Sequence, residues 1–110
     1  MKARLWRIRD RATFEALRQP DARVSKGPLA LSFVGGDGPP RLGFAVGRKV
    51  GGAVQRNRLR RRLRAVFAEM AGELPPGAYL VSASRGAAEL PYRELRELAR
   101  WMAERVPRRP

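Results

Sequence analysis

Residues 41–64 read RLGFAVGRKVGGAVQRNRLRRRLR and contain nine basic residues and no acidic one. The first part alternates bulky and small side chains, which predicts a β-strand with two unlike faces. The bulky positions are Leu42, Phe44 and Val46, and the small positions are Gly43, Ala45 and Gly47. Gly51 and Gly52 then interrupt the extended pattern, so we expect a turn and the start of a helix.

The predicted helix has one apolar stripe and an unusually basic remainder. Apolar residues recur along it at helical spacing, namely Leu59, Leu63, Val66, Phe67 and Met70. Arg58 and Arg62 flank one edge of this stripe. A guanidinium group suits phosphate because its planar fork donates two parallel hydrogen bonds and stays charged. Many charge runs are only solvated helix faces, but a run of a single sign favours contact with a nucleic acid.

The segment from Gly43 to Arg64 resembles the signature of the protein subunit of bacterial ribonuclease P. In that family, a strand ends in a basic pair, a turn follows, and the motif R-N-R-x-[KR]-R-x-x-R lies on a helix. Gly52 and Gln55 depart from the family pattern without touching the motif. The resemblance implies contact with the catalytic RNA through Arg48, Lys49, Arg56, Asn57, Arg58, Arg60, Arg61 and Arg64.

The composition of the whole chain, like the basic helix, indicates a polyanionic partner. The chain has 110 residues and a net charge of +14, which implies a polyanionic partner. We predict one RNA-binding domain over residues 1–110, with a basic arm at 1–9 and a basic tail at 107–110. No apolar run reaches the length of a membrane span, and no signal peptide is evident, so we expect a cytoplasmic protein.

The side chains that most nucleases and hydrolases use are missing. The sequence contains no histidine and no cysteine, which excludes histidine-based triads, thiol nucleophiles and the usual zinc sites. Asp10, Asp37 and Glu69 fall in different predicted elements, whereas a two-metal nuclease centre needs clustered carboxylates. We therefore expect no metal or cofactor in the protein and no RNA cleavage by the chain alone.

The remaining elements follow from local signals. Asp10 is a plausible N-cap for a helix over residues 11–19, with Phe14 and Leu17 on its inner side. Strands are predicted at residues 24–26, 28–34, 41–50 and 78–84, and the turn at residues 35–40 is expected to join the second and third as a hairpin. The last helix is expected to begin near Pro91. Its apolar stripe comprises Leu95, Leu98, Ala99, Met102 and Val106, and Trp101 falls outside it.

In the family, the first helix borders a cleft that takes the single-stranded 5′ leader of precursor tRNA. Phe14 matches the first cleft aromatic, and Arg18 stands where a second aromatic usually follows. The small faces of two strands suggest a shallow open surface beside this helix, separate from the surface of the basic helix. The resemblance thus implies a leader cleft formed by Phe14, Arg18, Ala30, Ser32, Gly43, Ala45, Gly47 and Arg85.

These features predict an α/β (α+β) two-layer sandwich with a small mixed sheet and the order α-β-β-β-α-β-α. A parallel crossover is ordinarily right-handed, whereas the resemblance implies a left-handed β-α-β crossover. It also implies a protein component of ribonuclease P that binds the catalytic RNA and precursor tRNA, with Mg²⁺ held by the RNA, and it implies no protein partner. The alternatives are a structural RNA-binding protein of ribosomal or RNA-chaperone type and, less favoured, a cationic membrane-surface helix.

Overall fold

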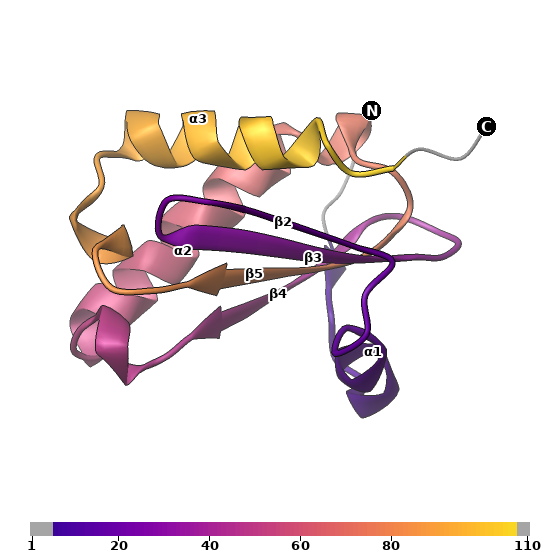
Figure 1. Cartoon of the computed structure of the whole chain (residues 1–110), viewed down its shortest axis with the longest axis horizontal. Helices are drawn as coiled ribbons and strands as arrows, with labels where there is room; N and C mark the ends of the chain where they lie inside the picture. The colour runs from indigo at the N-terminus through magenta and orange to yellow at the C-terminus, as the bar shows by residue number, and fades with distance from the viewer. Residues whose placement is uncertain (1–5, 108–110) are drawn as a thin grey trace.

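The computed structural model describes residues 6–107, which form a five-stranded mixed sheet with three α-helices (Figure 1). The strands are β1 (Trp6–Arg7), β2 (Ala22–Lys26), β3 (Leu29–Gly35), β4 (Arg41–Val46) and β5 (Gly77–Ala83). The α-helices are α1 (Arg11–Ala16), α2 (Ala53–Glu69) and α3 (Tyr92–Ala103). Three short 3-10 helices, η1 (Arg48–Val50), η2 (Ala71–Glu73) and η3 (Ala87–Glu89), complete the chain order. The predicted α+β class is confirmed.

The strand order in the sheet is β1-β4-β5-β3-β2. β5 lies between β3 and β4, antiparallel to the former and parallel to the latter. The predicted hairpin between the second and third strands is therefore wrong, because the segment after Gly35 must pass the end of β5 instead of making a tight turn. Gly77 begins β5 with φ 144°, and a Cβ there would collide with the carbonyl oxygen of Val34. Only glycine allows so close an approach of the two strands.

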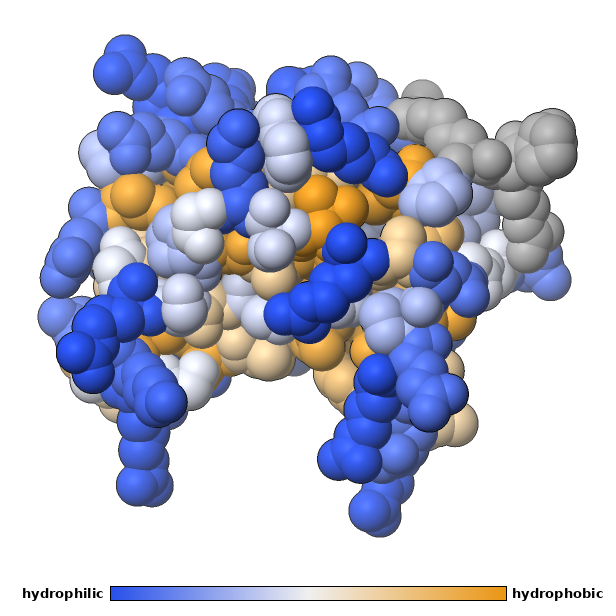
Figure 2. Space-filling model, viewed as in Figure 1, coloured by the Kyte–Doolittle hydropathy of each residue, from blue (hydrophilic) through white to orange (hydrophobic). Residues whose placement is uncertain are grey.

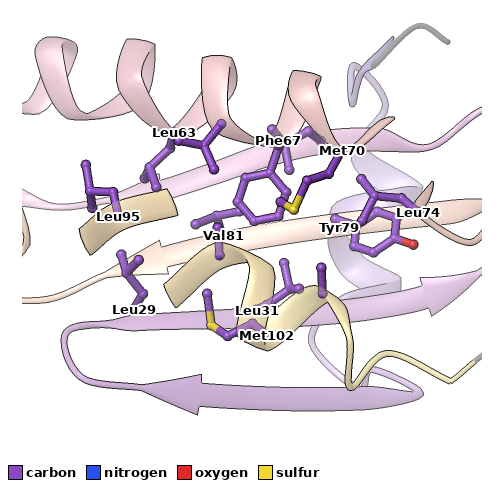
Figure 3. Close-up of a cluster of buried hydrophobic side chains, with 14 of the residues drawn as sticks. Leu29, Leu31, Leu63, Phe67, Met70, Leu74, Tyr79, Val81, Leu95 and Met102 are labelled. Carbon is purple, nitrogen blue, oxygen red and sulfur yellow. The ribbon is translucent and has the colours of Figure 1, made fainter. Parts of the chain in front are cut away.

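The main core lies between one face of the sheet and the two long helices (Figure 3). All five residues of the predicted α2 stripe are buried there, and Figure 3 shows Leu63 and Phe67 extending from the helix toward Val81 of β5. From α3, the buried stripe residues are Leu95, Ala99, Met102 and Val106, and Leu98 is half-buried. Amphipathic spacing therefore identified both helix faces that form the core.

Trp101, which falls off the α3 stripe, lies between two cations. The ammonium of Lys26 is 4.3 Å from a Trp101 ring centroid, and the guanidinium carbon of Arg105 is 3.6 Å from one. Such cation–π contacts hold a half-buried indole at the surface. None of the helices within residues 6–107 is long and apolar enough to cross a membrane.

The opposite face of the sheet carries a smaller cluster under α1. Ile8, Leu17 and Ala78 are buried together, with Val34 and Leu80 packed against them. Asp10 is the N-cap of α1, as predicted, and accepts a 2.9 Å hydrogen bond from the Thr13 amide. This arrangement fixes α1 over the sheet face that does not carry the main core.

Two predicted boundaries are wrong. The helix predicted over 11–19 ends at Ala16, because the amides of Arg18 and Gln19 bond three residues back and close a tighter turn. The strand predicted over 41–50 ends at Val46, where Gly47 opens η1 and the Val50 amide bonds to the Gly47 carbonyl. Residues 6–7, predicted as part of a basic arm, pair as β1 with the start of β4. The rest of that arm, residues 1–5, and the tail from residue 108 lie outside the described residues.

Candidate nucleic-acid interface

A hollow of about 660 Å³ lies between α1, the edge of β4 and one flank of α2, and we call it the β4 hollow. Within residues 6–107, β1 pairs only with Arg41 and Leu42, so no strand pairs with that edge of β4 beyond them. Its cationic and polar lining consists of Arg7, Asn57, Arg60, Arg61 and Arg64, and its aromatic and aliphatic lining includes Phe14, Phe44 and Val54. The hollow therefore combines guanidinium groups with the exposed ring of Phe14 and the half-buried ring of Phe44.

Two of these guanidinium groups are held in place by the fold. Arg60 donates to the Asn57 side-chain oxygen at 2.9 Å and to the Val46 carbonyl at 3.2 Å. The guanidinium carbon of Arg64 lies 5.1 Å from the centroid of the Phe44 ring. The asparagine of the R-N-R motif thus orients an arginine three residues later, and little conformational entropy remains to be lost when these cations meet an anion.

The charge in the β4 hollow is unbalanced. Burial lowers the pKa of Arg64 below its ordinary value, and repulsion from Arg7 and Arg60 lowers the pKa further. The group remains charged at neutral pH because the ordinary arginine pKa is so high. An entering phosphate would relieve this repulsion. Arg7 was not predicted as a site residue, because only the pairing of β1 with β4 brings it beside α2.

Phe14 contributes a ring to the same hollow. Its side chain is 39% exposed, so it is not a core residue. A Cβ at Gly43 would lie only 3.0 Å from the edge of the Phe14 ring, which shows that the ring rests on the bare strand at that position. The predicted separation between the basic helix and the surface containing Phe14 is wrong, since both line one hollow.

The face that carries the predicted small residues spans three strands instead of two, and Leu80 of β5 interrupts it. Strand register places Gly43, Leu80 and Ser32 in one row and Ala45, Ser82 and Ala30 in the next. The β5 residues in these rows were missed because β5 was not expected between the other strands. Alternation along residues 77–83 would have placed Leu80 and Ser82 on this face, had the strand order been known.

Ser32 is less accessible than its small size suggested. The residue is 1% exposed, and its hydroxyl accepts a 3.4 Å hydrogen bond from Arg23 of β2. The exposed Arg23 side chain therefore covers Ser32, and it is an additional cation on this face that the sequence analysis did not single out.

The other predicted site residues are distributed around the β4 hollow. Arg18 pairs weakly with Glu15 at 3.8 Å in a neighbouring hollow beside Val34. Arg48 and Lys49 are exposed on η1, and Arg85 is exposed beyond β5. In Figure 2, one group of hydrophilic side chains projects near η1 and the start of α2, and another projects near α1. The predicted cations therefore do not form one compact cluster.

Three arginines of α2 lie away from the β4 hollow. Arg58 and Arg62 line the opposite flank of the helix. Arg56 is half-buried, and its Nε atom is buried without a hydrogen-bond partner among the described residues. Within residues 6–107, no three carboxylates lie close enough together to hold a metal ion. The unpaired and oriented guanidinium groups thus suit the site to binding anions.

Comparisons with known proteins agree with this geometry. The sequence profile of the family described as Ribonuclease P matches residues 2–106. The ribonuclease P protein component of Thermobifida fusca is 42% identical over 99 residues, covering 81% of this chain and 67% of that protein. The corresponding component of Clavibacter michiganensis is 39% identical over 83 residues, covering 74% of each chain.

Solved structures share the fold over most of the chain. The RNase P protein of Thermotoga maritima superposes with a TM-score of 0.81 at 26% identity, covering 92% of this chain and 97% of that one. The RNase P protein of Staphylococcus aureus gives a TM-score of 0.82 at 21% identity, covering 90% and 93%, and this likeness supports the fold alone. Sequence, fold and the basic strand–turn–helix unit together show that the chain belongs to the ribonuclease P protein family.

Proposed function

We propose that residues 1–110 form a single RNA-binding domain that serves as the non-catalytic protein subunit of ribonuclease P in the cytoplasm. The family partners with ribonuclease P RNA in the 5′ maturation of tRNA. In this proposal the RNA carries out the phosphodiester hydrolysis with its own Mg²⁺ ions. The scattered carboxylates of residues 6–107 support this division, since they offer no metal cage.

The contact with the catalytic RNA is assigned to the basic residues of α2 and η1. The observation that carries this assignment is the pair of oriented guanidinium groups in the β4 hollow, Arg60 on Asn57 and Arg64 over Phe44. Charge-assisted hydrogen bonds from such groups to phosphate are strong and directional. The proposed set is Arg48, Lys49, Arg56, Asn57, Arg58, Arg60, Arg61 and Arg64.

The 5′ leader of precursor tRNA is assigned to Phe14 and the sheet face beside it. Proteins grip single-stranded RNA by stacking bases on aromatic rings next to a cationic track. Phe14 and Arg64 line the same hollow, so a strand entering it meets both kinds of group. Arg18, Ala30, Ser32, Gly43, Ala45, Gly47 and Arg85 complete the proposed leader surface, with Ser32 reached only if Arg23 moves aside.

The test is reconstitution with a ribonuclease P RNA at a Mg²⁺ concentration too low for the RNA alone. Adding the chain should restore precursor-tRNA cleavage at the mature 5′ end, and the chain without RNA should give no specific cleavage. Cleavage by a nuclease-free preparation lacking RNA would overturn the division of roles. Tight RNA binding without restored cleavage would favour the structural RNA-binding alternative.

A further inference from the structure

A second hollow lies on the other flank of α2, between this helix and the chain that leads from η3 into α3. We call it the α2–η3 notch. Its volume is about 500 Å³, and its lining includes Arg58, Arg62, Val50 and residues 88–91. Each helical residue turns by about 100°, so Arg58 and Arg62 lie roughly 130° around α2 from Asn57 and Arg64. The notch is therefore distinct from the β4 hollow.

The notch contains two cations without partners. Arg58 and Arg62 are four residues apart, which places them side by side on one helix face. Neither guanidinium forms an ion pair or a hydrogen bond with any residue that the structure describes. Glu89 also lines the notch, and it is paired with neither arginine. Two adjacent like charges that the fold leaves unbalanced form a strong local attraction for an anion.

Apart from Glu89, the wall opposite these cations is apolar. Val50 is buried at its base, Leu90 is half-buried and packed against the main core, and Pro91 is exposed at its rim. The volume falls in the range of pockets that enclose a small ligand. A free anion would use only the cationic side, whereas a nucleotide has a phosphate for one wall and a flat base or a ribose for the other.

We propose that the α2–η3 notch binds one unpaired nucleotide of an RNA strand. Its phosphate lies between Arg58 and Arg62, and its ribose or base packs on Leu90 and Pro91. The inference rests on the RNA-binding function, and it adds a second contact, so that RNA holds α2 from both flanks. Arg62 lies outside the R-N-R motif positions, and the notch gives this residue a role of its own.

Charge removal at Glu89 gives a test in which affinity should rise. Glu89→Gln removes the one carboxylate of the notch, and we expect RNA affinity to increase about threefold at physiological salt because a nearby repulsion is lost. Glu97→Gln is the matched control, since Glu97 is exposed on α3, lies outside the notch and has no ion pair among the described residues. A gain of affinity cannot come from misfolding. An equal response of the two variants would overturn the proposal.

Arg62→Ala should weaken binding about tenfold, as the loss of a charged hydrogen bond does. Arg93→Ala is the control, because Arg93 is an exposed α3 arginine outside the notch that is unpaired among the described residues. Melting temperatures must match the parent. Titrations with ribonuclease P RNA and with leader-bearing precursor tRNA, done separately, show which RNA supplies the nucleotide.

A photoreactive residue in place of Glu89 locates the contact. Crosslinks to an unpaired nucleotide are expected, and crosslinks confined to duplex RNA would overturn the nucleotide assignment. If Arg64→Ala weakens binding and Arg62→Ala behaves like Arg93→Ala, the notch proposal fails while the proposed function stands. If Arg64→Ala has no effect either, the assignment of α2 as the RNA contact fails as well.

Discussion

The guanidinium carbon of Arg64 lies 5.1 Å from the centroid of the Phe44 ring at the edge of the sheet. Phe44 packs partly against the main core, so the ring links the core of the protein to a cation of the basic helix α2. Arg64 is therefore positioned by a strand residue that is distant in sequence. In the proposed function, the strand before the basic helix therefore belongs to the binding surface and does more than support it.

Phe44→Leu should separate this positioning effect from the charge. Leucine keeps most of the packing, so we expect a stability loss of about 1 kcal/mol. Affinity for ribonuclease P RNA should fall by about 0.5–1 kcal/mol, because the cation–π contact that orients Arg64 is lost. Thermal unfolding and RNA titration on the same preparation measure the two effects. Unchanged affinity in a folded Phe44→Leu protein would show that the stacking does not orient Arg64 for RNA.

Binding to the catalytic RNA should depend strongly on salt. Arg61→Ala and Arg64→Ala should each weaken binding by about 1 kcal/mol or more. Each should also make the plot of log affinity against log salt concentration shallower, because fewer counterions are released. Arg93→Ala removes the same charge from α3 and should leave the slope close to that of the parent. An affinity indifferent to salt would argue against phosphate contacts by α2.

Acid should destabilise α1, because it protonates the N-cap residue Asp10. Hydrogen bonds from the side chain and backbone of Thr13 hold the pKa of Asp10 below its ordinary value of 3.8, and Arg41 adds a smaller effect. A carboxyl whose pKa is lowered by folding stabilises the protein above its unfolded pKa, and the stabilisation is lost as pH falls through the folded value.

Asp10→Asn keeps an acceptor for the Thr13 amide and removes the charge. Its melting temperature should therefore change less than that of the parent between about pH 4.5 and pH 2.5, where an aspartate titrates. If the melting temperatures of the two proteins change equally with pH across this range, the Asp10 carboxylate does not stabilise the cap of α1. The measurement needs no RNA, so it tests the cap independently of the binding proposals.

The sequence was sufficient to predict the helices and the basic motif, because their signals are periodic and local. The stripe from Leu59 to Met70 and the cap at Asp10 depend only on neighbours along the chain. The position of β5 could not be predicted in this way. The turn chemistry of residues 35–40 is compatible with a hairpin, and only packing between distant segments places Gly77 beside Val34.

The site prediction was likewise accurate for local signals and incomplete for contacts between distant segments. Residues of α2 were placed on the correct flanks because a helix has a fixed period. Arg7 and Arg23 were missed because strand pairing brings them to the site. Phe14 was predicted on the correct helix, but its place beside the arginines depends on how α1 crosses the sheet. Local periodicity thus identifies which face of a helix or strand carries a given residue. Which of these faces lie against one another is known only from the three-dimensional structure.

Gly43→Val should displace α1 from the sheet at the position where the Phe14 ring contacts Gly43. A Cβ there would lie 3.0 Å from the Phe14 ring and 3.2 Å from the Ile8 side chain, so the larger side chain must displace both. We expect a stability loss of about 1–3 kcal/mol, as overpacking typically gives, and a loss of the preference for leader-bearing tRNA. Gly47→Ala is the control for stability alone, because no atom lies within 4 Å of a Cβ there and because Gly47 itself belongs to the proposed leader surface. A stable Gly43→Val protein with full leader preference would show that Phe14 is not needed where it lies.

Phe14 and Arg64 should act together on the leader, because both line the β4 hollow. Phe14→Ala should reduce the affinity for leader-bearing tRNA by about 1–3 kcal/mol, the usual contribution of one stacked base, and should leave mature tRNA binding unchanged. The exposed ring makes a large loss of stability unexpected, and the melting temperature must be measured to confirm this. Arg64→Ala should weaken assembly with the catalytic RNA and should also lower leader preference.

The double variant distinguishes one shared hollow from two independent surfaces. Residues that contact the same nucleotides lose less in combination than the sum of the single losses, whereas distant sites add. We therefore expect the free-energy losses of Phe14→Ala and Arg64→Ala to be non-additive for leader-bearing tRNA. Additive losses would restore the view of two separate surfaces, and a folded Phe14→Ala protein that still prefers leader-bearing tRNA to the same extent would remove Phe14 from the leader site.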